Sequence, residues 1–380
     1  MKVSTESPHI VYGSNGGSMN DSNKQFKILS LNGGGVRGLF SITILAELER
    51  VLAERNNNPD LAIGNYFDMI TGASIGGIIA IALADGQKAR DLQGKFHKAA
   101  PDIFPRQSWV PNCVRNIYQL GKLLLSPLYK ANNLEKAVTE IVGTGKTVRS
   151  LKRRLLIPTV NLSTGRPLFI KTCHNSLFTR DDQFTLVDVA MATSAAPTYF
   201  LPHYIEWQSA YFADGGLLAN NPSFVAYHEA LNYLDDEEFK GITANDIKIL
   251  NIGTLSNDFC INPNNISRWF PGYFGLWGGG KALIETVMSS SQKMHGFMAG
   301  KALNREGMPP CYFSLDETVP DQQARVISLD NASEESLKAL VAWGKSVATT
   351  ATGKKALIET FFSTEAPAFI HPTDRKEASE

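Results

Sequence analysis

Short apolar runs alternate along most of the chain with longer segments whose apolar residues recur every three to four positions. FKILSL (26–31) and FDMITG (67–72) predict buried strands. Each is followed by a segment of helical periodicity, at 38–54 and at 76–85, and Gly86 ends the second one. This alternation predicts an α/β fold.

The second half of the chain continues the pattern without an internal repeat or an evident linker. We expect further strands at 154–160, 167–173 and 247–253, helices at 222–234 and 281–299, and a last long helix whose start is marked by the capping-box-like pair Asn331 and Glu334.

Both ends of the chain differ from this pattern because they are polar. The N-terminal segment contains GSNGGSMNDSN and the tail ends in PTDRKEASE, and neither can bury much apolar surface. We therefore expect a flexible segment at 1–24, a single domain at 25–365 and a flexible tail at 366–380.

Charge and cysteine content narrow the function. The 37 basic and 37 acidic residues cancel, so polymeric nucleic acid is not an expected partner. The four cysteines lie far apart, and the N-terminus lacks a signal-like segment, so we expect a cytoplasmic protein. The longest apolar run, IIAIALA (78–84), is too short to span a bilayer, so any membrane contact should be peripheral.

The first strand runs directly into a glycine-rich loop, within ILSLNGGGVRGLF (28–40). Gly33, Gly35 and Gly38 satisfy G-x-G-x-x-G, which is typical of a dinucleotide pyrophosphate site. The same backbone N–H groups at the mouth of a helix would equally suit an oxyanion formed during acyl transfer. A dinucleotide fold needs an acidic residue roughly 20 positions further on, where this chain has a helix end and ERNNNPD. The pattern thus favours the oxyanion.

A candidate nucleophile lies in YFDMITGASIGG, where a predicted strand turns into a predicted helix. Gly72, Ser74 and Gly76 form G-x-S-x-G, the nucleophile elbow, in the strand–turn–helix context that the motif requires. Glycines on both sides leave room for the tight bend and for the substrate.

A serine nucleophile needs a base, and two kinds are available. Asp214 ends a short apolar strand and is followed at once by Gly215 and Gly216. His228 and His295 are the alternatives for an ordinary Ser–Asp–His triad, although both fall within helical patterns.

Taken together, GGGVRG, GASIGG and DGG resemble the motifs of patatin-like phospholipases, and the likeness extends through SPLYKANNLEKAV, ATSAAPTYFLPH and DGGLLANNP to cover about residues 26–255. The resemblance implies a three-layer α/β/α fold with a mostly parallel central sheet. It also implies a Ser–Asp dyad in which Ser74 is the nucleophile and Asp214 the general base, without a metal or a cofactor. The expected oxyanion hole comprises Gly33, Gly34, Gly35, Val36, Arg37 and Gly38, and the glycines that shape the two catalytic turns are Gly72, Gly76, Gly215 and Gly216.

Within that family the chain looks most like the stand-alone bacterial enzymes of the CapV type, effectors of anti-phage signalling (CBASS). The resemblance implies a lipid acyl hydrolase that a cyclic di- or oligonucleotide activates to cleave membrane phospholipids at the inner face of the cell membrane, with homo-oligomers as a further expectation. An unregulated lipase or a catalytically silent lipid- or nucleotide-binding module remains an alternative. One departure is Leu255, which follows ILNIGT where a glycine is expected.

Two aromatic segments are candidates for substrate access. Residues 103–130 combine apolar side chains with arginines and lysines, and residues 267–280 combine aromatic residues with glycines. Each is a candidate lid or membrane contact, and the alternative for each is an ordinary packed or surface segment.

Overall fold

The fold is built around a mixed sheet of eight strands in the order β5-β6-β3-β2-β1-β7-β8, with β4 paired to β3 off this path. The structure is a computed structural model that describes residues 25–105, 126–234, 239–255, 277, 280–319 and 326–377. The five strands from β3 to β8 in this order are parallel, and β4, β5 and β6 are antiparallel to their neighbours. The strands are β1 (Phe26–Leu31), β2 (Met69–Gly72), β3 (Arg154–Asn161), β4 (Arg166–Lys171), β5 (His203–Ile205), β6 (Ala210–Asp214), β7 (Ile247–Ile252) and β8 (Tyr312–Leu315).

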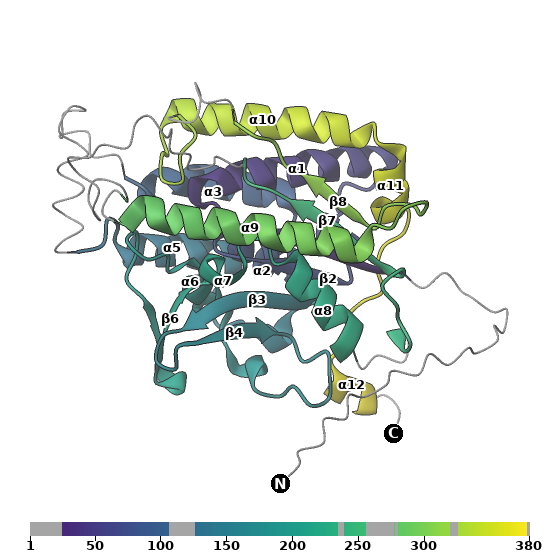
Figure 1. Cartoon of the computed structure of the whole chain (residues 1–380), viewed down its shortest axis with the longest axis horizontal. Helices are drawn as coiled ribbons and strands as arrows, with labels where there is room; N and C mark the ends of the chain where they lie inside the picture. The colour runs from purple at the N-terminus through teal and green to yellow at the C-terminus, as the bar shows by residue number, and fades with distance from the viewer. Residues whose placement is uncertain are drawn as a thin grey trace, which may run out of the picture.

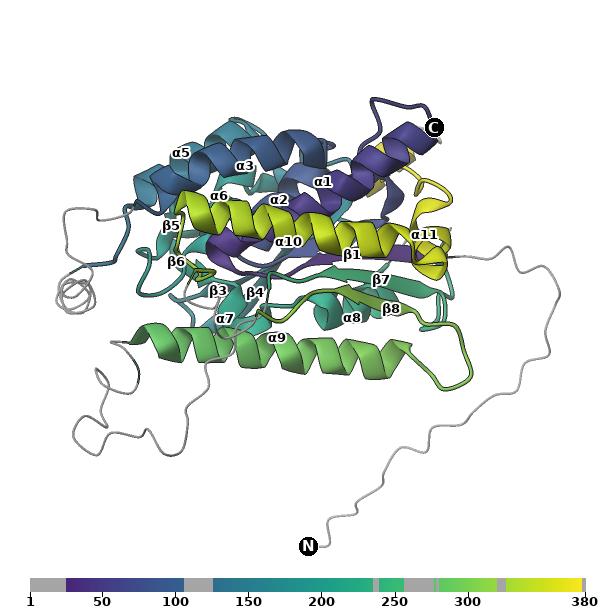
Figure 2. The same cartoon turned by 90° about the horizontal axis from the view of Figure 1, so that it is seen from above.

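Helices cover both faces of this sheet, as Figures 1 and 2 show. One layer contains α1 (Gly38–Arg55), α2 (Ile75–Ala84), α3 (Ala89–Ile103), α5 (Ala131–Val142), α6 (Leu186–Ser194) and α10 (Glu334–Thr352). The other contains α7 (Gly216–Ala219), α8 (Ser223–Tyr233) and α9 (Lys281–Leu303). The chain continues after α10 with α11 (Lys355–Phe362) and α12 (Pro372–Glu377).

The sequence of β1 explains its central place. All six residues are buried, and successive side chains point to opposite faces. Phe26 and Ile28 enter the apolar cluster under α8, whereas Leu29 and Leu31 enter the cluster under α1 and α2. A strand buried on both faces reads as a continuous apolar run, and FKILSL is close to one.

The expected strands and helices are present, and the three-layer α/β/α class is confirmed. The start of the last long helix differs in detail. Ser333, not Asn331, is the N-cap of α10, because its side chain accepts a hydrogen bond from Ser336 N. Asn331 instead accepts a bond from Ser333 N, one turn earlier.

Residues 366–374, at the start of the expected flexible tail, pack against the rest of the protein. Ala366, Phe369 and His371 are buried. The Arg153 guanidinium donates to the carbonyl oxygens of Ala366 (3.0 Å) and Pro367 (2.6 Å). The polar composition hid this docking, because Arg153 contacts backbone carbonyls, and the side-chain contacts of His371 and Asp374 are with Asp182 and Arg149, which are distant in the sequence.

Among the helices of the described ranges, none is long and apolar enough to cross a membrane.

Candidate active site

Ser74 occupies the sharp turn between β2 and α2. Its backbone has φ 54° and ψ −127°, a conformation that L-residues other than glycine rarely adopt. The turn is held by one hydrogen bond to a residue of α6 and by one within the turn itself. Ser74 N donates to the Thr193 hydroxyl (3.2 Å), and the Ser74 carbonyl accepts from Gly77 N (2.9 Å). The strained turn thereby presents the Ser74 side chain at the N-terminus of α2.

The glycines on either side of Ser74 are required by close backbone contacts. A Cβ atom on Gly72 would lie 2.1 Å from the Gly76 carbonyl oxygen, and one on Gly76 would lie 2.4 Å from the Leu31 carbonyl oxygen. Any larger residue would push α2 away from the sheet and open the turn. The spacing seen in the sequence therefore has a steric cause.

Asp214 ends β6 with its side chain fully buried. Gly216 N donates to Asp214 Oδ1 at 2.6 Å, while Oδ2 has no hydrogen-bond partner in the part of the chain that the structure describes. Burial raises the pKa of Asp214 to about 7, against a smaller lowering by the Ser74 hydroxyl and Gly216 N–H. The Ser74 hydroxyl is thus close enough to Asp214 to lower this pKa.

The end of α6 joins the nucleophile turn to the acid turn. Thr193 accepts from Ser74 N through its hydroxyl, and it accepts from Gly215 N through its carbonyl (3.2 Å). The Thr193 hydroxyl also donates to the Pro158 carbonyl in β3 (2.8 Å). Asp214 N donates to the Ala195 carbonyl (3.0 Å). A single short segment therefore sets the position of Ser74 relative to Asp214.

The glycine loop lies directly against the nucleophile. A Cβ atom on Gly33 would lie 3.2 Å from Ser74 Cβ. Most of the loop's N–H groups already have acceptors: Gly33 N donates to Asn220 O, Val36 N to Leu329 O, Arg37 N to Gly34 O, and Gly38 N to the carbonyls of Gly35 and Val36. By contrast, the N–H groups of Gly34 and Gly35 bond to no residue in the described part of the chain.

This inventory narrows the predicted oxyanion hole. Of the predicted set, the Gly33, Val36, Arg37 and Gly38 amides are engaged in holding the loop in shape. Within this set, only the N–H groups of Gly34 and Gly35 have no acceptor among the described residues and so remain available to an oxyanion. Local sequence could not separate these roles, because Asn220 and Leu329 are distant in the chain.

Arg37 and Leu255 support the loop from its far side. Arg37 Nη1 donates to the Leu255 carbonyl (3.0 Å), and Leu255 N donates to Asp316 Oδ1 (3.0 Å). Leu255 has φ 59°, so it adopts the left-handed conformation for which glycine was expected. Although Leu255 departs from the family pattern, the backbone of this turn keeps the conformation expected for a glycine.

Two pockets meet at the loop. The first has a volume of about 540 Å³, which includes the part that is open to solvent. Ser74 and Gly35 are among the residues that line it. Its other lining is almost entirely apolar: Ile75, Ile78, Phe96, Ile103, Phe104, Leu134, Ser194, Ala196, Tyr199, Phe200, Met288 and Leu329. A pocket of this character suits a hydrocarbon chain.

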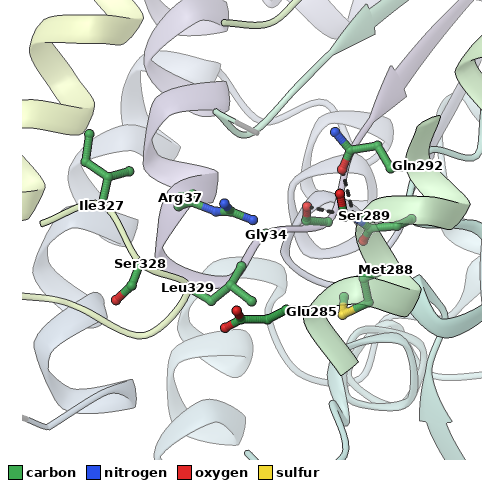
Figure 3. A pocket seen from close by; sticks show the side chains of 11 residues that line it. Gly34, Arg37, Glu285, Met288, Ser289, Gln292, Ile327, Ser328 and Leu329 are labelled. Atoms are coloured by element: carbon green, nitrogen blue, oxygen red, sulfur yellow. Dashed lines mark hydrogen bonds between the residues drawn. The ribbon is translucent and has the colours of Figure 1, made fainter. Parts of the chain in front are cut away.

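The second pocket encloses about 520 Å³, again with its open part, and its lining is more polar than that of the first (Figure 3). Arg37 and Gly34 lie on one side, and Glu285, Ser289 and Gln292 of α9 face them. Met288 and Leu329 border both pockets. The loop therefore lies between an apolar compartment and a more polar one.

Neither candidate histidine joins the dyad. His228 is exposed on α8, and His295 is buried on α9, where burial lowers its pKa. Among the described residues, no histidine hydrogen-bonds to Ser74 or Asp214. The structure gives no support to an ordinary Ser–Asp–His triad.

One group of possible metal ligands lies elsewhere. Cys173, Asp182 and His371 bring one donor atom each to within 4.8 Å of one another. His371 Nε2 lies 2.9 Å from Asp182 Oδ2, and Arg149 Nη1 lies 2.8 Å from His371 Nδ1. Because the Arg149 guanidinium already supplies a positive charge here, the cluster reads as an attachment for the segment before α12.

Of the two predicted access segments, residues 106–125 in the first, and all of the second except 277 and 280, lie outside the described residues. They stay predictions.

A serine in a strained elbow, a buried carboxylate beside it and a loop with two unengaged amides together define a serine hydrolase. Comparison with known proteins specifies which kind. Residues 29–227 match the family described as patatin-like phospholipase, and the chain belongs to that family.

Three bacterial relatives are each named cGAMP-activated phospholipase. The chain is 45% identical over 345 residues to the one from Escherichia coli (strain TW11681), covering 90% of this chain and 94% of that protein. It is 44% identical to the one from Vibrio cholerae serotype O1, covering 91% and 96%. It is 33% identical to the one from Pseudomonas aeruginosa, covering 91% and 95%.

Proposed function

We propose that this protein is a phospholipase that cleaves acyl esters of membrane phospholipids through an acyl-enzyme on Ser74, and that a cyclic nucleotide activates it. The observation that carries the proposal is the pairing of a fully buried Asp214 with the elbow serine. A carboxylate with an ordinary pKa near 3.9 is a weak base for a serine. Burial raises the pKa of Asp214 to about 7 and so makes it a better one.

The geometry supports a two-step reaction. Ser74 Oγ attacks the ester carbonyl while Asp214 takes its proton, and the Gly34 and Gly35 N–H groups donate to the oxyanion. Collapse of the tetrahedral intermediate breaks the C–O ester bond, and Asp214 returns the proton to the departing alcohol. Asp214 then deprotonates a water molecule that attacks the acyl-enzyme, which releases the fatty acid and regenerates Ser74.

The two pockets suggest how a phospholipid would be held. The acyl chain would occupy the apolar pocket beside Ser74, lined by Ile78, Phe104 and Phe200 among others. The more polar part of the lipid would lie toward Gln292 and Arg37. With this division the ester would lie at the glycine loop, between the two compartments.

The names of the bacterial relatives support activation by cGAMP or a related cyclic dinucleotide, because all three are aligned over nine-tenths or more of this chain. The corresponding biological role is that of an anti-phage effector acting on the cell's own membrane. An unregulated lipase is the alternative that differs only in this regulation.

The test is release of fatty acid from phospholipid vesicles, with and without a panel of cyclic di- and trinucleotides. Wild type should release fatty acid with one nucleotide, Ser74→Ala should not, and Ser346→Ala, an exposed serine of α10, should behave as wild type. Release that ignores every nucleotide would leave an unregulated lipase. No release from wild type under any condition would indicate a silent binding module.

A further inference from the structure

The outward face of α9 is unusually apolar. Leu283, Val287, Met294 and Phe297 are 37%, 38%, 52% and 66% exposed and follow one stripe of the helix. Ser290, Lys293 and Lys301 are the other exposed residues of this stripe. We call these seven residues the outer face of α9. The opposite stripe, with Met288, Ser291, His295, Ala299 and Leu303, is buried against the rest of the protein.

The same protein provides a comparison. α10 is an outer helix of the opposite layer (Figure 2), and its exposed residues are polar apart from one alanine: Glu334, Glu335, Lys338, Ala342, Lys345, Ser346, Thr349 and Thr350. A helix face in contact with water normally has this composition. The outer face of α9 therefore departs from what solvent alone would favour, and contiguous exposed apolar side chains of this kind mark an interaction surface.

The charge on this face indicates its partner. It carries Lys293 and Lys301 and no acidic residue, and Glu285, the only acid of α9, lines the polar pocket instead. Lys301 Nζ lies 5.7 Å from the centre of the Phe297 ring, so cation and ring are presented together. Apolar side chains flanked by lysines match the interface of an anionic lipid bilayer. A second copy would bring the same lysines with no acid on the face to neutralise them.

The position of the outer face relative to the active site supports the same partner. Glu285, Met288, Ser289 and Gln292 of α9 line the pockets at the glycine loop (Figure 3). The outer face is thus a neighbouring side of the helix that borders the site. A membrane against it would lie next to the pocket into which a lipid must pass.

We propose that the outer face of α9 docks on the surface of an anionic phospholipid bilayer, with the helix lying in the interface plane and with Met294 and Phe297 inserted. The proposal rests on the proposed phospholipase function, since the bilayer would be both the docking surface and the source of substrate.

The first experiment measures binding without turnover. In a Ser74→Ala background, cosedimentation is measured with vesicles of phosphatidylcholine alone and with vesicles that also contain phosphatidylglycerol. Met294→Ser with Phe297→Ser should weaken binding on the order of tenfold or more, because two large apolar side chains no longer leave water. Lys301→Glu should weaken binding only to the anionic vesicles. Matched controls are Lys338→Glu on α10 and Leu177→Ser, an exposed leucine outside α9, and both should bind as the parent does.

The second experiment separates docking from catalysis. With Ser74 intact, the Met294→Ser, Phe297→Ser variant should hydrolyse a short-chain phospholipid dispersed as monomers at the wild-type rate and lose activity on vesicles. If wild type hydrolyses neither substrate, the proposed function fails while the binding result still decides the docking. Unchanged vesicle binding by the double variant would overturn the docking proposal. So would sedimentation velocity showing that the substitutions dissociate a dimer without affecting vesicle binding, because the face would then join two copies.

Discussion

Replacing Asp214 with asparagine should abolish hydrolysis. It should also raise the free energy of unfolding relative to wild type more above neutral pH than in acid. The carboxylate is fully buried, and burial raises its pKa to about 7. In the unfolded chain the same group should titrate near 3.9. The folded protein therefore binds a proton at Asp214 that the unfolded chain has already lost, and holding this group ionised costs stability.

The size and sign of the effect follow from this difference. The stability associated with protonated Asp214 is fully present below about pH 4 and is lost as the pH rises to about 7. About three pKa units at about 1.4 kcal/mol each correspond to a total of about 4 kcal/mol. Between pH 5 and pH 8 the share is about 2.5 kcal/mol. Asparagine does not titrate. The free energy of unfolding of Asp214→Asn minus that of wild type should therefore increase by about this amount from pH 5 to pH 8.

The assay is urea unfolding of wild type, Asp214→Asn and Ser74→Ala at several pH values, followed by tryptophan fluorescence. Only the change of the difference with pH is used, because any hydrogen bond lost by the amide enters equally at every pH. Ser74→Ala is also expected to be inactive, but it keeps the carboxylate and should follow the wild-type pH dependence. A difference between Asp214→Asn and wild type that stays constant from pH 5 to pH 8 would refute the raised pKa. The kcat/KM of wild type should also rise through about pH 7 as Asp214 ionises.

Four further substitutions test the rest of the site. A Cβ atom on Gly34 would lie 2.5 Å from Thr254 Oγ1; Gly34→Ala should therefore displace an oxyanion donor and lower kcat about a hundredfold or more, measured on a monomeric ester with circular dichroism as the folding control. His228→Gln and His295→Gln should each keep most of the wild-type rate. Replacing the base of a Ser–Asp–His triad would instead lower the rate on the order of a thousandfold in the same assay. Ile78→Trp should fill the apolar pocket, so that hydrolysis of long-chain esters falls far more than that of short-chain esters; an equal fall across a chain-length series would contradict the assignment of that pocket to the acyl chain.

The nucleophile turn could be predicted from the sequence because its determinants are largely local. The contacts that require Gly72 arise within the turn and the first residues of the helix that surround Ser74, whereas Gly76 is required by the backbone at the end of β1, at Leu31 and Asn32. Strand and helix positions followed from periodicity for the same reason. What the periodicity of α9 could not show is which of its apolar residues, such as Phe297, remain exposed.

Features that depend on distant segments escaped the sequence. The carbonyls of Asn220 and Leu329 decide which loop amides stay available, and neither position carries a motif that predicts this. The docking of residues 366–374 was missed in part because the contacts of Arg153 are with backbone carbonyls, which every sequence has. The raised pKa of Asp214 depends on complete burial, which only the assembled fold creates.

The attachment of both catalytic turns to Thr193 has a consequence for regulation. Because Ser74 N and Gly215 N bond to the same residue at the end of α6, a shift of that helix carries nucleophile and base together as a rigid body. The spacing within the dyad is then insensitive to movements of the surrounding layers. An activating ligand would therefore have little effect on the reaction between Ser74 and the ester. It would control the enzyme mainly by opening or closing the access of the lipid to the active site.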